Sequence, residues 1–482
     1  MSFVSPLYIL FFPAVYIAWL LVGERHRWML LLAASIAFYA ALKAPHLLAA
    51  LALVSAISYV AGTAIDRSGE ERVKGWWLGG GVVANLLVLV TLRYLPFLTG
   101  QLDALLGAVG AGIAVPLAPP LATIGVSYFV FQAISYLVDV YTEVEKPERH
   151  PGYLALYLAF FPKLLQGPIE RAGDLLPQLR ARYAFEYESA RAGLLLFGWG
   201  LFKKVIVADH LGMYADTVYG DVRAFEGVPL VLATYFYAGQ LYYDFSGYTD
   251  MALGTARLFG IRLTQNFNRP YGATSIVEFW RRWHISFSRW ILDYIFKPLQ
   301  MQFRGWKNLG APLALVLTFL ACGVWHGATW TFVAWGALHG LYMAASVLTA
   351  RARQGLRERW RVHPAVRRVL GAVFTFHLVC FAWIFFRADT VAEALYVAGH
   401  LLSGGVAEGA RLLLAHGKVQ LLISLAAVAL VELASRRDGE AIAGEPFRRR
   451  PVLVRWVAYC ALVLSILYLG EGDRSGFLYF KF

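Results

Sequence analysis

Two histidines within tryptophan-rich segments are the residues best suited to chemistry in this chain. His326 lies in GVWHGATW (323–330), inside a stretch, 311–349, that contains no Lys, Arg, Asp or Glu. His284 lies about forty residues upstream in WRRWHISFS (280–288), where aromatic and cationic residues alternate. An ionisable side chain at membrane depth is costly and is a candidate functional group by default. The two segments therefore predict proton-transfer chemistry at or within a membrane.

The composition is that of a polytopic membrane protein. Hydrophobic residues make up 59% and charged residues 16% of the chain, against roughly 45–50% and about 25% in soluble domains. The net charge of +13 is explained by contact with an anionic inner leaflet, so we expect membrane lipids and no nucleic acid as partners. The three cysteines, Cys322, Cys380 and Cys460, fall in apolar runs without motif spacing. We therefore expect neither a disulfide framework nor a metal site.

Apolar runs of spanning length predict an all-α fold with roughly 11–12 membrane helices. A pair of short helices is expected over 312–349, and single spans near 6–22, 28–43, 47–65, 76–93, 121–141, 193–208, 228–243, 369–386, 418–434 and 452–469. Segments rich in Lys and Arg alternate with basic-poor ones, which places the basic segments in the cytoplasm and both chain termini outside. The basic-poor segments, 94–120, 209–227 and 402–417, are expected on the outer side.

Two regions do not fit simple membrane spans. Residues 153–168 (YLALYLAFFPKLLQGP) are short, contain Lys163 and are broken by two prolines, which predicts a re-entrant hairpin surrounded by protein or water. Residues 244–311 are too polar to span and too aromatic for an ordinary loop. For this region we expect interfacial helices and re-entrant backbone around a central tunnel.

A helix that carries His284 is predicted within the second of these regions. Ser275 resembles an N-cap residue, and Glu278 follows three positions later, which is the pattern of a capping box. On the helix that follows, Trp280, His284 and Ser288 recur at every fourth position and would share one face.

Basic residues outnumber acidic ones nine to two between 257 and 308. Such an excess suits a phosphate-bearing donor substrate. It equally suits anionic lipid at the inner leaflet, and both readings stay open for most of these residues. For Arg281 and Arg282, contact with lipid is the favoured reading.

Several strings, in the same order along the chain, resemble the membrane-bound O-acyltransferase (MBOAT) family. The closest branch is the membrane component of bacterial alginate O-acetylation, and the D-alanyl transfer protein of teichoic acid modification is more distant. One departure is QMQFRGWKN (300–308), where the alginate branch usually has a Gly-Gly-Asn-Arg string. The strings that carry the resemblance are VSYFVFQAISYLVDVY (126–141), FFPKLLQGPIER (160–171), DFSGYTDMA (244–252), NFNRPYGATSIVEFWRRWHISFSRWILDYIFKPL (266–299), GVWHGATWTFVAWGALHG (323–340), FTFHLVCFAWIFFRA (374–388) and FLYFKF (477–482).

The resemblance implies one membrane domain over 1–482, with N-terminal helices in 1–150, a catalytic core in 151–350 and C-terminal helices in 351–482. It implies an acyl group, with acetyl favoured, that enters from a cytoplasmic thioester, either acetyl-CoA or an acyl carrier protein. The group would leave on the outer side of the bacterial cytoplasmic membrane. Its acceptor would be a polysaccharide hydroxyl, reached directly or through a periplasmic acyltransferase partner. Neither a bound cofactor nor a metal is implied.

The family histidine of the WHG motif maps to His326, and the second functional histidine maps to His284. A hydroxyl that attacks a thioester must lose its proton, and a neutral histidine in an apolar pocket is suited to accept it. His326 fits that role, whereas His284 would orient the donor or pair with an aspartate. Packing is favoured for two further histidines, His339 and His377. The residues expected to bind substrate are Trp325, Trp280, Ser288, Asp244, Asp250, Asn268, Gln166 and Arg282.

Two other functions compete with this one. A transporter or polysaccharide-export pore would carry out no covalent chemistry, but it predicts inverted repeats with paired broken helices. The segment 153–168 has no such counterpart in the second half of the chain. Acylation of a lipid or a protein by the same machinery is the other alternative. Signatures of other enzymes, such as a phosphate-binding glycine loop, GxSxG or HExxH, do not occur in the sequence.

Overall fold

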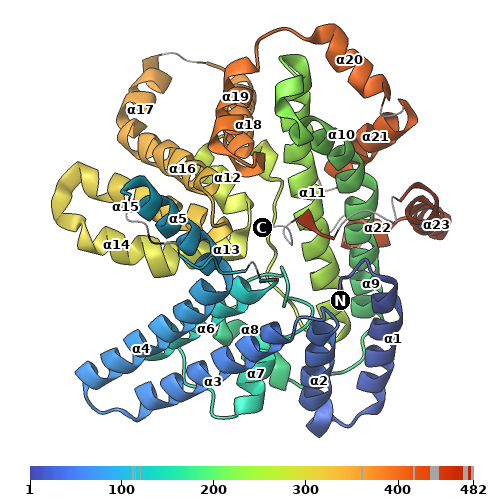
Figure 1. Ribbon diagram of the computed structural model, residues 1–482. Helices are drawn as coiled ribbons and strands as arrows, with labels where there is room; N and C mark the ends of the chain where they lie inside the picture. Colours follow the sequence, from blue (N-terminus) through green and yellow to red (C-terminus); the bar gives the residue numbers. More distant parts are fainter. Residues whose placement is uncertain are drawn as a thin grey trace. The chain divides into compact units, whose positions relative to one another are not determined.

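Every regular element that the structure describes is a helix (Figure 1). The computed structural model describes the chain except for residues 111–112, 114, 120, 360–361, 416–417, 435–443, 471–475 and 479–482. The predicted all-α class is therefore confirmed. The last four residues of the FLYFKF string, and with them the predicted position of the C-terminus outside the membrane, lie outside the described residues.

The chain forms two compact units. The N-terminal unit consists of residues 1–194 and 251–264, and the C-terminal unit of residues 195–250 and 265–482. Two helices, α9 (Tyr187–Phe202) and α11 (Val228–Leu258), each pass from one unit into the other along the chain. The boundaries do not coincide with the predicted divisions at 150 and 350, and the single membrane domain stays a prediction.

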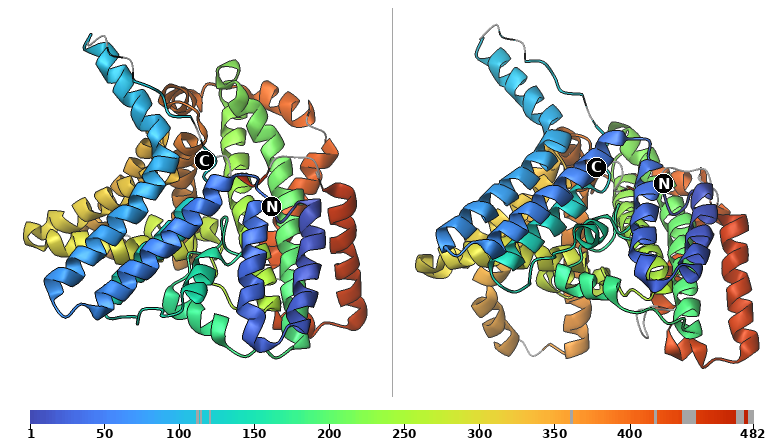
Figure 2. Two further views of the ribbon diagram at one scale, coloured as in Figure 1. Left: turned by 60° about the horizontal axis from the view of Figure 1, so that its bottom comes forward. Right: turned by 90° about the horizontal axis from the view of Figure 1, so that it is seen from below.

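In the N-terminal unit, α3 (Pro45–Arg67), α4 (Glu71–Leu89) and α6 (Val126–Tyr141) pack against one another, and Figures 1 and 2 show α3 and α4 side by side. A π-helical turn, η2 (Val90–Tyr94), joins α4 to α5 (Leu95–Ala108), so that the three form one continuous helix. The basic-poor segment 94–120 thus contains a helix over 95–108, and its location outside the membrane stays a prediction. The other elements of this unit are α1 (Pro6–Leu21), η1 (Glu24–His26), α2 (Arg27–Ala40), α7 (Pro151–Ala159) and α8 (Ala172–Arg180).

The segment 153–168 is broken where the prolines predict. Helix α7 ends at Ala159, and the chain continues in turns to Gly167. Lys163 is fully buried there, and its ammonium donates to the Gln132 side-chain oxygen and lies 5.2 Å from the ring centroid of Tyr157. Protein groups thus surround the buried cation. That the segment is a re-entrant hairpin in the membrane stays a prediction.

The C-terminal unit carries the second half of α9, most of α11 and the helices that follow. The predicted span 228–243 is longer in the structure, since α11 continues through the polar string at 244–252 to Leu258. The other elements are η3 (Lys203–Ala208), α10 (Asp209–Gly220), η4 (Val222–Ala224), η5 (Pro270–Gly272), α12 (Ile276–Arg282), α13 (Ile285–Ile291), η6 (Leu292–Phe296), α14 (Lys297–Gln302), η7 (Arg304–Leu309), α15 (Gly310–His326), α16 (Trp330–Leu348), α17 (Ala350–Arg359), α18 (Pro364–Arg387), α19 (Val391–His400), α20 (Val406–Ala415), α21 (Lys418–Ala434), α22 (Glu445–Arg448) and α23 (Val452–Leu469).

Within the described residues, six helices are long and apolar enough to cross a membrane, which confirms a polytopic membrane protein. These are Pro45–Arg67, Glu71–Ala108, Arg304–His326, Trp330–Leu348, Pro364–Arg387 and Val452–Leu469. Three shorter apolar helices accompany them, at Pro6–Leu21, Val126–Tyr141 and Leu422–Ala434. The predicted total of roughly 11–12 membrane helices and the central tunnel stay predictions.

Helices α15 and α16 form the predicted helical pair and approach closely through glycines. A Cβ atom on Gly323 would lie 2.3 Å from the carbonyl oxygen of Phe332, and one on Gly336 would lie 2.4 Å from that of Phe319. Neither glycine can carry a side chain without separating the helices. Small residues at such contacts are typical of membrane helix pairs, because association there depends on close packing.

We predict that Gly336→Ala lowers the thermal stability of the purified protein in detergent. The added methyl group overpacks the helix pair, at a cost of about 1–3 kcal/mol, which should lower the unfolding midpoint by about 2 °C or more. The matched control is Gly79→Ala on α4, where a Cβ atom would meet nothing within 4 Å. The control should leave stability unchanged or raise it, since alanine favours helix over glycine. Equal midpoints for the two variants would contradict the close approach.

Candidate active site

The helix predicted to carry His284 is interrupted at that residue. Helix α12 begins as expected, with the Ser275 hydroxyl accepting from the backbone N–H of Glu278 at 3.2 Å. It ends at Arg282, because Trp283 is extended (φ −105°, ψ 128°) and His284 is left-handed (φ 43°, ψ 57°). A non-glycine residue rarely adopts this conformation and needs surrounding contacts to hold it. The prediction that Trp280, His284 and Ser288 share one helical face is therefore wrong.

Asn266 holds the chain in place after this break. Its backbone oxygen accepts from the N–H of Ile285 at 2.9 Å, and its side-chain oxygen accepts from the Ser286 N–H at 3.1 Å and hydroxyl at 2.7 Å. These bonds satisfy N–H groups of the first turn of α13, which otherwise lack partners. Asn266 is fully buried, whereas the predicted Asn268 is exposed and donates through its backbone to the carbonyl of Arg282. Sequence reasoning missed Asn266 because its partners lie 20 residues away.

Aromatic rings enclose the His284 side chain, which is 1% exposed. Its ring centroid lies 4.7 Å from that of Phe245, 5.0 Å from that of Phe287 and 6.1 Å from that of Trp325. Burial lowers the pKa of His284 to about 3, since an apolar surrounding disfavours the charged imidazolium. His284 is consequently a neutral imidazole at physiological pH.

His326 is the last residue of α15 and is 5% exposed. Its ring centroid lies 4.6 Å from that of Trp325, 4.8 Å from that of Trp335 and 5.9 Å from that of Phe287. Phe287 and Trp325 stack on one another with centroids 4.2 Å apart. Both histidines therefore contact the same pair of stacked rings, which we call the aromatic pair. The structure places His284, His326 and Trp325 against one another and adds Phe287.

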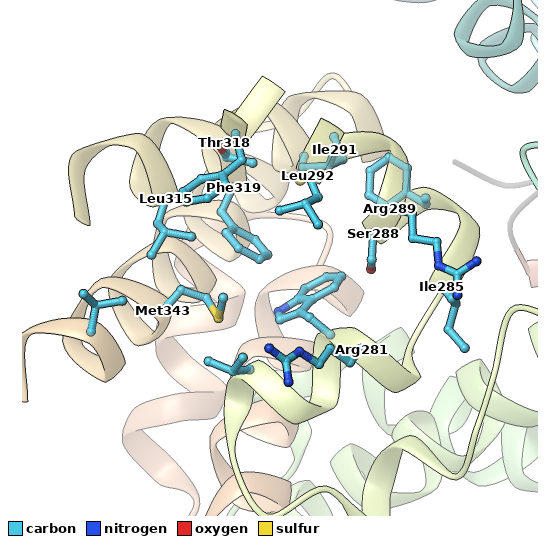
Figure 3. Close-up of a pocket in the computed structure, with 16 residues that line it drawn as sticks. Arg281, Ile285, Ser288, Arg289, Ile291, Leu292, Leu315, Thr318, Phe319 and Met343 are labelled. Carbon is cyan, nitrogen blue, oxygen red and sulfur yellow. The ribbon is translucent and has the colours of Figure 1, made fainter. Parts of the chain in front are cut away.

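Trp280 and Ser288 lie on a different surface from the two histidines. Both line a cavity of about 550 Å³ in the C-terminal unit (Figure 3), and neither His284 nor His326 is among its described lining residues. The indole N–H of Trp280 donates to Nδ1 of His339 at 3.3 Å, and the Ser288 hydroxyl donates to the carbonyl of Trp283 at 3.0 Å.

His339 is fully buried in the packed interior, in agreement with the predicted packing role. Its ring centroid lies 4.9 Å from that of Trp335, which also contacts His326. His377 is instead an exposed residue of α18, and its Nδ1 lies 2.7 Å from the carbonyl oxygen of Val373.

The two predicted aspartates are bound by lysines that the sequence analysis did not single out. Asp244 lies 2.8 Å from Nζ of Lys204, and its other oxygen accepts from the backbone N–H of Leu478 at 3.0 Å. Asp250 lies 2.7 Å from Nζ of Lys203. Asp244 thus ties a buried cation to the C-terminal segment of the chain, which indicates an architectural contribution. Whether either carboxylate binds substrate stays a prediction.

Two further predicted residues differ in how far their polar groups are satisfied. Arg282 donates to the Glu278 carboxylate at 2.5 Å, within the same helix. Gln166 belongs to the N-terminal unit and is 1% exposed, and neither its side-chain nitrogen nor its oxygen has a hydrogen-bond partner among the described residues. A buried amide without partners is costly, and whether Gln166 binds substrate stays a prediction. Among the described residues, no three His, Cys, Asp or Glu side chains come together as metal ligands.

The site thus consists of two buried histidines against one aromatic pair, in a chain whose helices are long and apolar enough to cross a membrane. Residues 121–386 match the model of the MBOAT, or membrane-bound O-acyltransferase, family. The chain belongs to this family, and it is a membrane acyltransferase. The segment that matches contains Gln166, Asn266, His284 and His326.

Its relatives confirm the branch of the family that the motifs predict. The chain is 37% identical to a probable alginate O-acetylase of Azotobacter vinelandii over 396 residues, which cover 81% of this chain and 76% of the relative. It is 33% identical to a peptidoglycan O-acetyltransferase of Helicobacter pylori over 366 residues, with 70% and 67% covered. The similarity to a teichoic acid D-alanyltransferase of Bacillus subtilis is more distant, at 27% over 331 residues, with 66% and 79% covered.

We predict that Asn266→Ala reduces acyl transfer about tenfold or more, because Asn266 holds the backbone that follows His284. The substitution leaves the buried N–H and hydroxyl of Ser286 without an acceptor, which costs about 1–3 kcal/mol. It also removes the contacts that hold the backbone beside the left-handed His284. The measurement is polymer acetylation at matched protein levels in the membrane. Asn308→Ala is the control and should retain full activity, because Asn308 is an exposed residue of η7 and is not among the predicted site residues. Equal losses in both variants would contradict the role assigned to Asn266.

Proposed function

We propose that the chain transfers an acetyl group from a cytoplasmic thioester to a hydroxyl of an extracytoplasmic polysaccharide, directly or through a periplasmic partner. The donor would be acetyl-CoA or an acyl carrier protein. The names of the alginate and peptidoglycan relatives support acetyl as the group and a polysaccharide as the acceptor. The alternation of basic and basic-poor segments supports a bacterial cytoplasmic membrane with the N-terminus outside.

The observation that carries this function is the placement of two buried histidines against one aromatic pair. His326 is the general base. It accepts the hydroxyl proton as the hydroxyl oxygen attacks the thioester carbonyl carbon; the carbon–sulfur bond then breaks, and the proton passes to the departing thiolate. The position of His326 at the end of α15 suits this role, because the C-terminus of a helix stabilises the positive charge that the imidazole acquires.

His284 is assigned a different task because its imidazole is a weak base. A histidine with a pKa of about 3 does not accept a proton at neutral pH, but its neutral N–H is a hydrogen-bond donor. We assign that N–H to the thioester oxygen, on which negative charge develops during the attack. Preorganised donors in a water-poor site stabilise such charge strongly.

The catalytic assignment predicts that His326→Ala abolishes transfer while leaving a membrane-inserted protein. Loss of a general base costs about 10²–10⁴-fold in rate. The measurement is acetylation of the cell-envelope polymer at matched protein levels, and His377→Ala is the control, because His377 is an exposed histidine of α18. Near-normal acetylation by the His326 variant would overturn its role.

The assignment of His284 as a donor predicts a rank order of variants. His284→Gln keeps an N–H donor and should retain about tenfold more activity than His284→Leu. Because His284 is neutral above about pH 4, its replacement should also leave the shape of the pH–rate profile between about pH 5 and 8 unchanged. Initial rates of acetyl transfer by purified protein with acetyl-CoA measure both. A profile that loses its acidic limb in His284→Gln would show that His284 titrates in this range.

A further inference from the structure

A large apolar cavity lies apart from the two histidines in the C-terminal unit. It has a volume of about 550 Å³ and is enclosed by α12, α13, η6, α15 and α16 (Figure 3). Its volume falls within the ~300–1,000 Å³ range of ligand sites. Hydrocarbon side chains form most of its wall, among them Leu292, Phe296, Leu315, Phe319, Met343 and Val347.

Two arginines stand on the α12 and α13 side of this cavity. Figure 3 shows Arg281 and Arg289 on that side, with Leu315 and Met343 on the opposite side. Both arginines are exposed, and neither forms an ion pair with another described residue. The neighbouring Arg282, by contrast, is paired with Glu278. The two guanidinium groups therefore remain available to an anionic ligand.

The cavity lacks the groups that acyl transfer needs. Phe287 lies in its wall and also contacts both histidines, so it stands between the cavity and the proposed reaction site. The Ser288 hydroxyl is donated to the carbonyl of Trp283. The lining also includes the Thr318 hydroxyl, which donates to the carbonyl of Ala314, and the thiol of Cys322. No histidine or carboxylate is among the described lining residues, so a molecule bound in the cavity meets no general base there.

The cavity is accessible at its rim beside apolar helices. Leu292 and Val347 both line it and are each 44% exposed. Two of its walls, α15 and α16, belong to segments long and apolar enough to span a membrane. The exposed apolar side chains at this rim let an acyl chain enter the cavity along the two helices.

We propose that this cavity binds one anionic phospholipid, with an acyl chain among the hydrocarbon side chains and the phosphate between Arg281 and Arg289. Arginine recognises phosphate with paired, charge-assisted hydrogen bonds, and basic pockets beside membrane helices are suited to acidic headgroups. A thioester donor is disfavoured because its reactive carbon must reach His326, and Phe287 closes that path. The lipid site goes beyond acyl transfer and does not depend on it.

The headgroup contact is tested by native mass spectrometry of the purified full chain, with phosphatidylglycerol and phosphatidylcholine of identical acyl chains. We expect phosphatidylglycerol to bind at least about tenfold more tightly. The double variant R281A/R289A should lose this preference. The matched control is R304A/K307A, which removes two charges from exposed residues of η7 that do not line the cavity. Equal binding of both lipids, or an equal loss in the control, would overturn the proposal.

The acyl-chain contact is tested with Val347→Trp, which places a large side chain at the rim. It should reduce phosphatidylglycerol binding about tenfold, whereas Leu341→Trp should not, since Leu341 is an exposed residue of the same helix outside the cavity. Acetyl-CoA is added in a parallel titration. Displacement of bound lipid by acetyl-CoA would instead make the cavity a donor site and would contradict the lipid assignment, leaving the proposed acyl transfer untouched.

Discussion

The stacking of Phe287 on Trp325 is the interaction on which the proposed site depends. The two rings lie 4.2 Å apart, and the imidazoles of His284 and His326 both pack against them. Each ring comes from a different helix, Phe287 from α13 and Trp325 from α15. The stack therefore joins the two helices at the point where both imidazoles pack. Aromatic pairs of this kind also exclude water, which strengthens every electrostatic interaction beside them.

Two backbone constraints allow this stack to form. The first is the left-handed conformation of His284, which ends α12 early and lets α13 start in a new direction, held by Asn266. The second is the glycine contact between α15 and α16, which brings Trp335 against the ring of His326. Both constraints have a cost, since a left-handed histidine is strained and glycine is a poor helix former.

The elements that local sequence specifies were predicted well. The apolar run without charge at 311–349 predicted the α15–α16 pair, and the spacing of Ser275 and Glu278 predicted the start of α12. The break at His284 could not be predicted in this way, because its partner Asn266 lies in a separate segment and no spacing rule connects them. The four-residue spacing therefore predicted one helix through His284, with Trp280 and Ser288 on the same face.

For the charged residues too, the sequence shows how many there are, whereas several of their ion pairs depend on contacts between distant segments. The excess of Lys and Arg was evident in the sequence, but the sequence did not distinguish paired cations from unpaired ones. In the structure, Lys203 and Lys204 are bound by Asp250 and Asp244, and Arg282 by Glu278. Arg281 and Arg289 have no such partner among the described residues and border the cavity. Only tertiary structure separates cations that stabilise the fold from cations that are available to a ligand.

The central claim is that His284 and His326 act on the same reacting group, and a double-mutant cycle tests it most directly. Single-turnover acetyl transfer would be measured for His284→Ala, His326→Ala and the double variant, in purified protein with acetyl-CoA. If both histidines act in one transition state, their effects are not additive, and the double variant loses no more than about the larger single loss. A loss equal to the product of the two single losses would contradict this account and place the histidines at independent sites.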